Sequence, residues 1–139
     1  MSTQTTPLIG LYQVCGTVGN VGTPGAPIMH FNLLVHPSTH SVTGVVHITQ
    51  AIAPPNGDIV ISNVTGRIYS TGLGPITQIV ALKGTYTQSF PPPAIGEIVE
   101  NFSAHLAIDN AWDGKGGFEY GNGAHHIENV PVKHGPCGK

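Results

Sequence analysis

Alternation of apolar and polar residues with a period of two dominates this chain. No window of about eleven residues keeps apolar positions at helical spacing without an interrupting Gly or Pro. Runs rich in Val, Ile, Thr, Tyr and Phe predict about eight strands instead. We expect these strands at residues 8–18, 27–36, 42–52, 58–70, 76–87, 96–109, 116–120 and 126–133.

The segments between these runs are short and consist of turn-forming residues. They read GNVGTPGA, PSTH, APPNG, STGLGP, SFPPPAIG and NAWDGKG. None is long enough to hold the helical crossover that parallel strands require, so the strands should be antiparallel and pair with their neighbours in sequence. The sequence therefore predicts an all-β domain with meander connections.

Three strand segments share a glycine at their third position, and this weak repeat bears on how the sheet closes. They are VTGVVHIT from Val42, VTGRIYST from Val64 and LKGTYTQ from Leu82. Glycine inside a strand often marks a bulge or a sharp bend, which a closed sheet needs. We therefore predict a single antiparallel β-barrel. A two-sheet sandwich is the alternative, because the pairing of the first and last strands is left open.

The 139 residues fit one domain, and we expect residues 1–7 and 134–139 to be loose tails. Only 9% of the residues are charged and Lys and Arg together number 5, so nucleic acid is not an expected partner. The formal net charge of -2 gives little repulsion between molecules. We therefore expect a homo-oligomer that forms through an exposed sheet face or strand edge.

The start of the chain, MSTQTTPLIG, has neither the basic nor the apolar region of a secretory signal, and no stretch has the length of a membrane-spanning helix. We expect a cytoplasmic protein or one exported without such a signal. The 2 cysteines, Cys15 and Cys137, allow one disulfide. Cys15 lies in a strand-like run, where we favour a buried unpaired thiol over a bridge that ties the termini together.

Two neighbouring stretches, GAPIMHFNLLVHPSTHS and VTGVVHITQAIAPP, resemble an uncharacterised bacterial family, domain of unknown function 1842. The resemblance covers about the first two thirds of the chain, and Gln50-Ala51 and Pro54-Pro55 are its most particular part. It implies a bacterial origin and a small β domain. It brings no activity, cofactor or catalytic residue.

Residues 30–47, HFNLLVHPSTHSVTGVVH, contain four histidines, and histidine is the commonest metal ligand. If PSTH forms a four-residue hairpin loop, His36 pairs with Ser41 and His30 lies directly across from His47. Two imidazoles need further ligands, and His105 on the polar face of the 96–109 strand is the candidate. The chain has no His-x-His pair, so we favour solvent-facing histidines without a metal.

Arrangements typical of enzymes are missing from the sequence. Cys15 has no assignable histidine partner, and neither a phosphate-binding glycine loop nor a nucleophile elbow occurs. Glu97 and Glu100 fall on opposite faces of one strand, which does not suit the paired carboxylates of glycoside hydrolysis. We expect Glu100 to reach solvent at a strand end rather than to lie buried with a shifted pKa. We therefore predict that the protein is not an enzyme and has no cofactor.

The segment DNAWDGKGGFEYGNGAHH gathers the only Trp with acids, amides and glycines. An aromatic ring beside carboxylates and amides suits a shallow glycan site, because the ring stacks on a sugar while the polar groups bind its hydroxyls. The candidate ligand-binding residues are Asn110, Trp112, Asp113 and Tyr120. In the alternative, which we favour, Trp112 folds back to cap the open end of the barrel.

Two hypotheses of function follow. The favoured one is a non-catalytic recognition or self-assembly module whose loops bind a glycan or a protein weakly and in several copies. The alternative is a barrel with a functional interior, which holds a small apolar ligand or carries metal-dependent chemistry on histidines. Bulky side chains throughout the interior favour the first hypothesis. An open cavity lined by His30, His47 or His105 favours the second.

Overall fold

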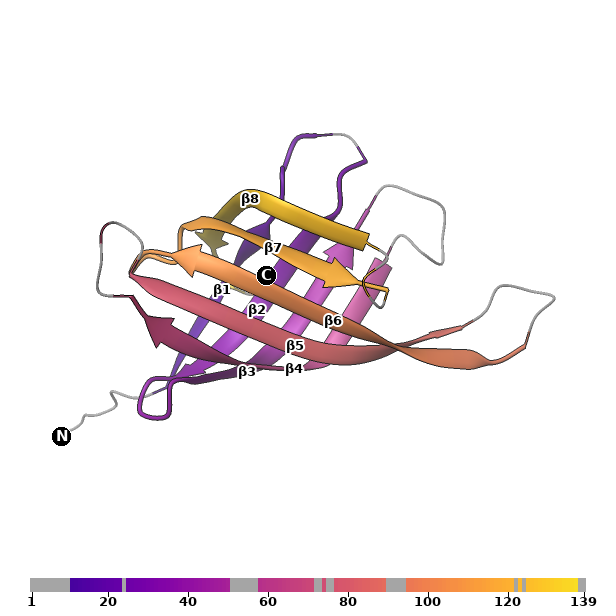
Figure 1. Ribbon diagram of the computed structural model, residues 1–139, viewed down its shortest axis with the longest axis horizontal. Helices are drawn as coiled ribbons and strands as arrows, with labels where there is room; N and C mark the ends of the chain where they lie inside the picture. Colours follow the sequence, from indigo (N-terminus) through magenta and orange to yellow (C-terminus); the bar gives the residue numbers. More distant parts are fainter. Residues whose placement is uncertain are drawn as a thin grey trace.

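A computed structural model describes residues 11–23, 25–50, 58–71, 74, 77–89, 95–121, 123 and 125–137. These residues form eight strands: β1 (Tyr12–Val18), β2 (Ile28–His36), β3 (Ser41–Thr49), β4 (Asp58–Ser70), β5 (Gln78–Ser89), β6 (Glu97–Ile108), β7 (Gly114–Tyr120) and β8 (His125–Gly135). Each strand pairs antiparallel with its neighbour in sequence and β8 returns to β1, which closes a barrel (Figure 1). The predicted all-β meander barrel is confirmed, and the sandwich alternative is excluded.

The hairpin of β2 and β3 has the register that the four-residue loop predicted. His36 lies opposite Ser41, and His30 lies opposite His47. Loop length and the alternation of apolar residues together fix a hairpin register, because a slip of one residue would turn every apolar side chain outward. This part of the sequence therefore specified its own pairing.

The barrel interior is lined by apolar side chains. No polar or charged side chain among the described residues is buried. Alternate positions of each strand point inward, as the alternating burial along β2 illustrates. The largest side chains that are fully buried belong to Phe102, Phe118, Met29, Leu33, Ile48, Ile61, Leu106 and Ile108.

Two of the repeated glycines lie where neighbouring strands approach closely. A Cβ on Gly44 would collide with the backbone oxygen of Asn32 in β2, and a Cβ on Gly66 would collide with that of Ala81 in β5. Where two backbones approach this closely, only glycine fits, because it has no Cβ. The repeat therefore helps the sheet to curl into a barrel.

Two strands carry an extra residue relative to their neighbours. In β4, Ser62 and Asn63 together face the single residue Val45 of β3, since Gly44 pairs with Val64 and Val46 pairs with Ile61. In β8 the register shifts in the same way opposite residue 117 of β7. Such β-bulges bend the strand that carries them and increase its twist.

The bend in β4 leaves β5 and β6 to continue as a two-stranded arm. β5 pairs with β4 only as far as Lys83, whereas it pairs with β6 as far as Ser89. β6 pairs with β7 only from Ser103 onward. The β5–β6 arm, defined here as residues 86–89 and 97–100, therefore extends past the neighbouring strands, as Figure 1 shows.

The barrel closes where β1 meets β8, and a disulfide reinforces this seam. The pairing runs from Cys15 opposite Gly135 to Val18 opposite Val132. Cys15 is bonded to Cys137 with a Cα–Cα distance of 5.2 Å, so the expectation of an unpaired buried thiol is wrong, although Cys15 is buried. The expected C-terminal tail is also shorter, because β8 includes residues 134 and 135. The expected tail at residues 1–7 lies outside the described residues.

Removing the disulfide should lower the free energy of unfolding by about 2–5 kcal/mol, because a bridge between residues 122 positions apart restricts the unfolded chain strongly. Urea unfolding of the wild type with and without a reductant measures the effect. The Cys15→Ala/Cys137→Ala double variant serves as control. Its stability should match that of the reduced wild type and should not change when the reductant is added. Equal midpoints for oxidised and reduced wild type would contradict the prediction.

Candidate functional site

His30 and His47 are neighbours on the outer face of β2 and β3. Their ring centroids lie 6.0 Å apart. His30 Nε2 lies 3.3 Å from Thr49 Oγ1, and His47 Nε2 lies 2.8 Å from Asp58 Oδ1. Partial burial lowers the pKa of His30 below its ordinary value, and the adjacent His47 lowers it further. Each ring therefore has a polar side chain of the protein as its neighbour, Thr49 for His30 and Asp58 for His47.

His105 does not join this pair. It lies on β6, which β4 and β5 separate from β3, and its Nε2 is 3.0 Å from Glu128 Oε1 of β8. The two side chains meet across Gly117 of β7, which has no side chain to separate them. In the part of the chain that the structure describes, no group of three His, Cys, Asp or Glu side chains is arranged to hold a metal ion.

Trp112 caps one end of the barrel and is not a surface plate for a sugar. Its backbone has a left-handed φ of 66°, and its side chain is 4% exposed. The ring packs 6.1 Å from that of Phe31, and its Nε1–H donates to the Tyr12 hydroxyl at 3.4 Å. The Asp109 carboxylate stabilises the turn by accepting hydrogen bonds from two backbone N–H groups, those of Ala111 and Asp113.

The other residues of the expected glycan site do not converge with Trp112. Asn110 Oδ1 accepts a hydrogen bond from the Thr77 hydroxyl. Asp113 Oδ1 accepts from the His134 backbone N–H at 2.9 Å and lies 2.8 Å from the His134 ring, and both contacts hold the pKa of Asp113 below its ordinary value. Tyr120 is at the far end of β7 and stacks on His125. These contacts do not bring the four residues together around one exposed ring, and the burial of Trp112 agrees with the capping alternative that we favoured.

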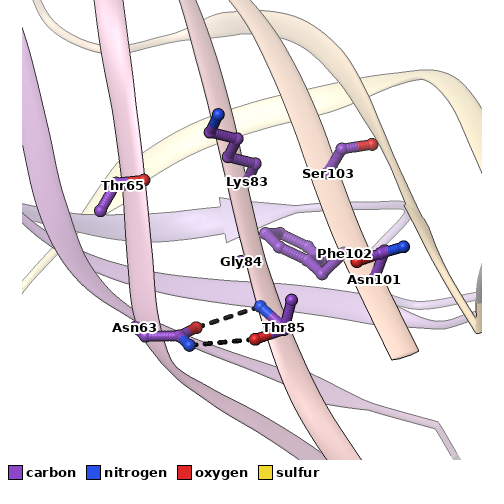
Figure 2. Close-up of a pocket in the computed structure, with 8 residues that line it drawn as sticks. All are labelled: Asn63, Thr65, Lys83, Gly84, Thr85, Asn101, Phe102 and Ser103. Carbon is purple, nitrogen blue, oxygen red and sulfur yellow. Dashed lines mark hydrogen bonds between the residues drawn. The ribbon is translucent and has the colours of Figure 1, made fainter. Parts of the chain in front are cut away.

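A polar groove of about 400 Å³ lies instead on the outer face of β4, β5 and β6. Figure 2 shows the side chains that line it, with Lys83 at one end and the hydrogen bonds between Asn63 and Thr85 at the other. Thr65, Lys83 and Ser103 occupy one cross-strand row. The lining residues are Asn63, Thr65, Lys83, Gly84, Thr85, Asn101, Phe102 and Ser103.

The bulge in β4 creates this groove. β4 bends at Ser62–Asn63 and leaves β5, so backbone pairing between the two strands stops at Thr65 and Lys83. Asn63 fills the gap with its side chain, because its Oδ1 accepts from the Thr85 backbone N–H and its Nδ2 donates to the Thr85 hydroxyl. An amide side chain thus replaces a lost backbone partner.

A second groove of about 210 Å³ continues the first at Lys83. It is lined by Arg67 and Tyr69 of β4 and by Ala81 and Lys83 of β5, together with backbone neighbours. Tyr69 is 53% exposed, and the small side chain of Ala81 leaves the surface hollow beside it. The outer face of β4 and β5 therefore presents an aromatic ring, two cations and several hydroxyl and amide groups along one line.

Sequence reasoning missed this groove, although the chain holds a signal for the bulge behind it. The residues at the two bulges read Ile-Ser-Asn-Val at 61–64 and Ile-Glu-Asn-Val at 127–130. In both segments two polar residues stand between apolar ones, which breaks the period of two and is the pattern that an extra strand residue produces. The valine that follows each pair of polar residues, Val64 or Val130, is buried.

The β5–β6 arm is fixed to the barrel by Tyr86. Its hydroxyl donates to Glu100 Oε1 at 2.9 Å and accepts from the Gly121 backbone N–H at 2.8 Å. Burial, followed by the contact with Glu100, raises the pKa of Tyr86 above its ordinary value. Glu100 is half-buried at this contact, so it is not the fully solvated strand-end acid that we expected.

The fold and these grooves define a closed antiparallel β-barrel with an apolar interior and polar side chains on the outside, among the residues that the structure describes. The chain belongs to the family described as Domain of unknown function (DUF1842), whose model matches residues 9–126. The resemblance to that family is therefore confirmed, and the matched segment includes the grooves and the arm. No curated protein matches the chain. No helix in the described residues is long and apolar enough to cross a membrane.

Truncation of Trp112 should destabilise the barrel by about 3–5 kcal/mol, because the ring is buried against the core. Urea unfolding of Trp112→Ala measures the loss. Trp112→Phe, which keeps most of the buried area, is the control and should lose markedly less. A stability of Trp112→Ala within about 0.5 kcal/mol of wild type would mean that the ring is at the surface.

Tyr86 should make the protein lose stability in alkali. Its folded-state pKa is raised above the ordinary value of 10.0, so its contribution is fully present below pH 10.0 and is lost as the pH rises further. Tyr86→Phe should be about 1–3 kcal/mol less stable at neutral pH, because Gly121 N–H and Glu100 lose a partner.

Unfolding of both proteins between pH 8 and pH 11 measures this dependence. The Tyr86→Phe variant should lose less stability over that range than wild type, with a residual loss from Tyr120, whose pKa burial also raises. Tyr69→Phe, a change at an exposed tyrosine, should keep the wild-type slope. An unchanged slope in Tyr86→Phe would contradict the assignment.

Proposed function

We propose that this protein is a non-catalytic β module that associates with copies of itself through the β5–β6 arm. The observation that carries the proposal is the outer edge of β5 beyond Thr85, with which no described strand pairs. An unpaired edge offers a row of backbone N–H and C=O groups to another strand. A second copy of the same edge can pair with it antiparallel about a two-fold axis.

The charges on the two edges of the arm favour β5 as the contact. The β5 residues 86–89 read Tyr-Thr-Gln-Ser and carry no charge, whereas Glu97 and Glu100 lie on β6. Charged side chains are a usual protection of strand edges against association, because like charges repel when two edges meet. The β6 edge has this protection and the β5 edge lacks it.

Thr87 is the residue on which such pairing would centre. The Thr85 backbone N–H points toward β4, where it donates to Asn63. Alternate residues of a strand direct their backbone groups to the same side, so the N–H and C=O of Thr87 also point away from β6. Val99, opposite Thr87 on β6, is 65% exposed and lies on the same face of the arm.

The apolar interior supports a non-catalytic module over chemistry inside the barrel. Apolar side chains occupy the inward positions, and the three histidines considered for an inner site, His30, His47 and His105, lie at exposed or half-exposed outward positions. A net charge of -2 adds little repulsion between copies.

Light scattering at several protein concentrations and physiological salt tests the proposal. Wild type should show at least twice the mass of one chain. Thr87→Pro should raise the dissociation constant of the oligomer about tenfold or more, because proline removes the outward N–H. Thr87→Ser keeps that N–H and is the matched control, which should assemble like wild type. A wild type that stays monomeric at high concentration would overturn the proposal.

A further inference from the structure

Two neighbouring grooves lie on the outer face of β4, β5 and β6, and Lys83 lines both of them. We propose that this surface binds an acidic oligosaccharide, that is, a linear sugar that carries carboxylate or sulfate groups. The binding surface lies on the barrel wall and does not depend on pairing of the arm.

Hydroxyl and amide groups supply the contacts that sugar hydroxyls require. Thr65 and Ser103 flank Lys83 in one cross-strand row, and neither side chain has a hydrogen-bond partner among the described residues. Asn63 and Thr85, already bonded to each other, hold the end of the groove in a fixed shape. A rigid set of donors and acceptors loses little entropy on binding a ligand.

Apolar surface beneath and beside these groups suits the faces of sugar rings. Phe102, which is almost fully buried, forms the floor of the larger groove beneath Gly84 (Figure 2). Tyr69 is half-exposed at the far end of the smaller groove, next to Ala81. The C–H face of a sugar can stack on the exposed Tyr69 ring while its hydroxyls reach the polar side chains, whereas Phe102 has almost no exposed surface.

Arg67 and Lys83 favour an anionic sugar over a neutral one. Thr65 pairs with Lys83 and Arg67 pairs with Ala81, so the two cations occupy diagonal positions with Cβ atoms on the order of 7 Å apart. β5 contains no carboxylate, and the only one of β4, Asp58, is at its other end beside His47. Neither cation forms an ion pair among the described residues, although Glu119 of β7 lies opposite Ser103 in the same cross-strand row as Lys83.

Lys115 and Lys133 form a similar diagonal pair on β7 and β8. Unlike Lys83 and Arg67, this pair has carboxylates close to it. Lys115 lies opposite Pro131, two residues from Lys133. There Asp113 interacts with Lys133, and Glu128 lines the same groove as Lys115. Carboxylates on that side reduce the attraction for an anion, which makes Lys133 a suitable site for a control substitution.

The length of the surface suits an oligosaccharide rather than a single sugar. From Asn63 to Tyr69 along β4 the surface extends on the order of 20 Å. The larger groove alone, about 400 Å³, is within the range of small-molecule sites. We expect weak binding of each sugar unit and a dissociation constant of about 0.1–1 mM for the whole ligand.

Calorimetric titration of the full chain with a galacturonic acid hexamer and a heparin-derived hexasaccharide tests the proposal. Cellohexaose is the neutral comparison, and inorganic phosphate and a single-stranded DNA hexamer are the other anions. At least one acidic sugar should bind saturably, and cellohexaose should bind at least about fivefold more weakly. Lys83→Gln and Arg67→Gln should each weaken binding about five- to tenfold, whereas Lys133→Gln, with the same change in net charge, should not alter it.

Tyr69→Ala should weaken binding of the same sugar about threefold or more, because it removes a stacking surface of the groove. Several outcomes would overturn the proposal: no saturable binding of either acidic sugar, equal binding by Lys83→Gln and wild type, or DNA or phosphate binding as tightly as the sugar. Thr87→Pro should keep the affinity per chain, and Lys83→Gln should keep the oligomer mass. Failure of the sugar site is thereby separated from failure of self-association.

Discussion

The extra residue that β4 carries at Ser62–Asn63 is the constraint on which both the groove and the arm depend. A straight β4 would continue to pair with β5 past Lys83 and would cover its edge. The bulge directs the first part of β4 toward β3 alone, so that β5 continues with β6 as its single partner. The Asn63 side chain then secures Thr85 across the gap. One inserted residue thus produces both the groove and a β5 edge with which no described strand pairs.

The inside and outside of the barrel have separate physical roles. The interior is uniformly apolar in the described residues and provides stability. Outside, His47, His105 and His134 each lie within 3.0 Å of a carboxylate oxygen. Such exposed pairs contribute little stability, and they balance a carboxylate charge only when the histidine is protonated. Arg67 and Lys83 form no ion pair with a carboxylate among the described residues, and this sets their face apart.

Strand positions and the register of His30 with His47 were predictable from the sequence, because the apolar period and a short loop determine them locally. The inward position of Trp112 was the alternative that the sequence favoured, but its left-handed backbone was not predictable from composition. The Cys15–Cys137 bridge depends on two chain ends that meet only after the barrel closes. The groove was not predictable from any one strand, since it combines side chains of three strands around a bulge.

The seam between β1 and β8 has a consequence for how the chain folds. Every other pairing in the barrel joins strands that follow one another, so each hairpin can form as soon as its second strand is available. β1 and β8 must instead find each other across nearly the whole chain, which carries the largest loop-closure entropy. We therefore expect the seam to form last. Until β8 emerges from the ribosome, the nascent sheet keeps open edges on both β1 and β7, and in that interval it is most exposed to aggregation.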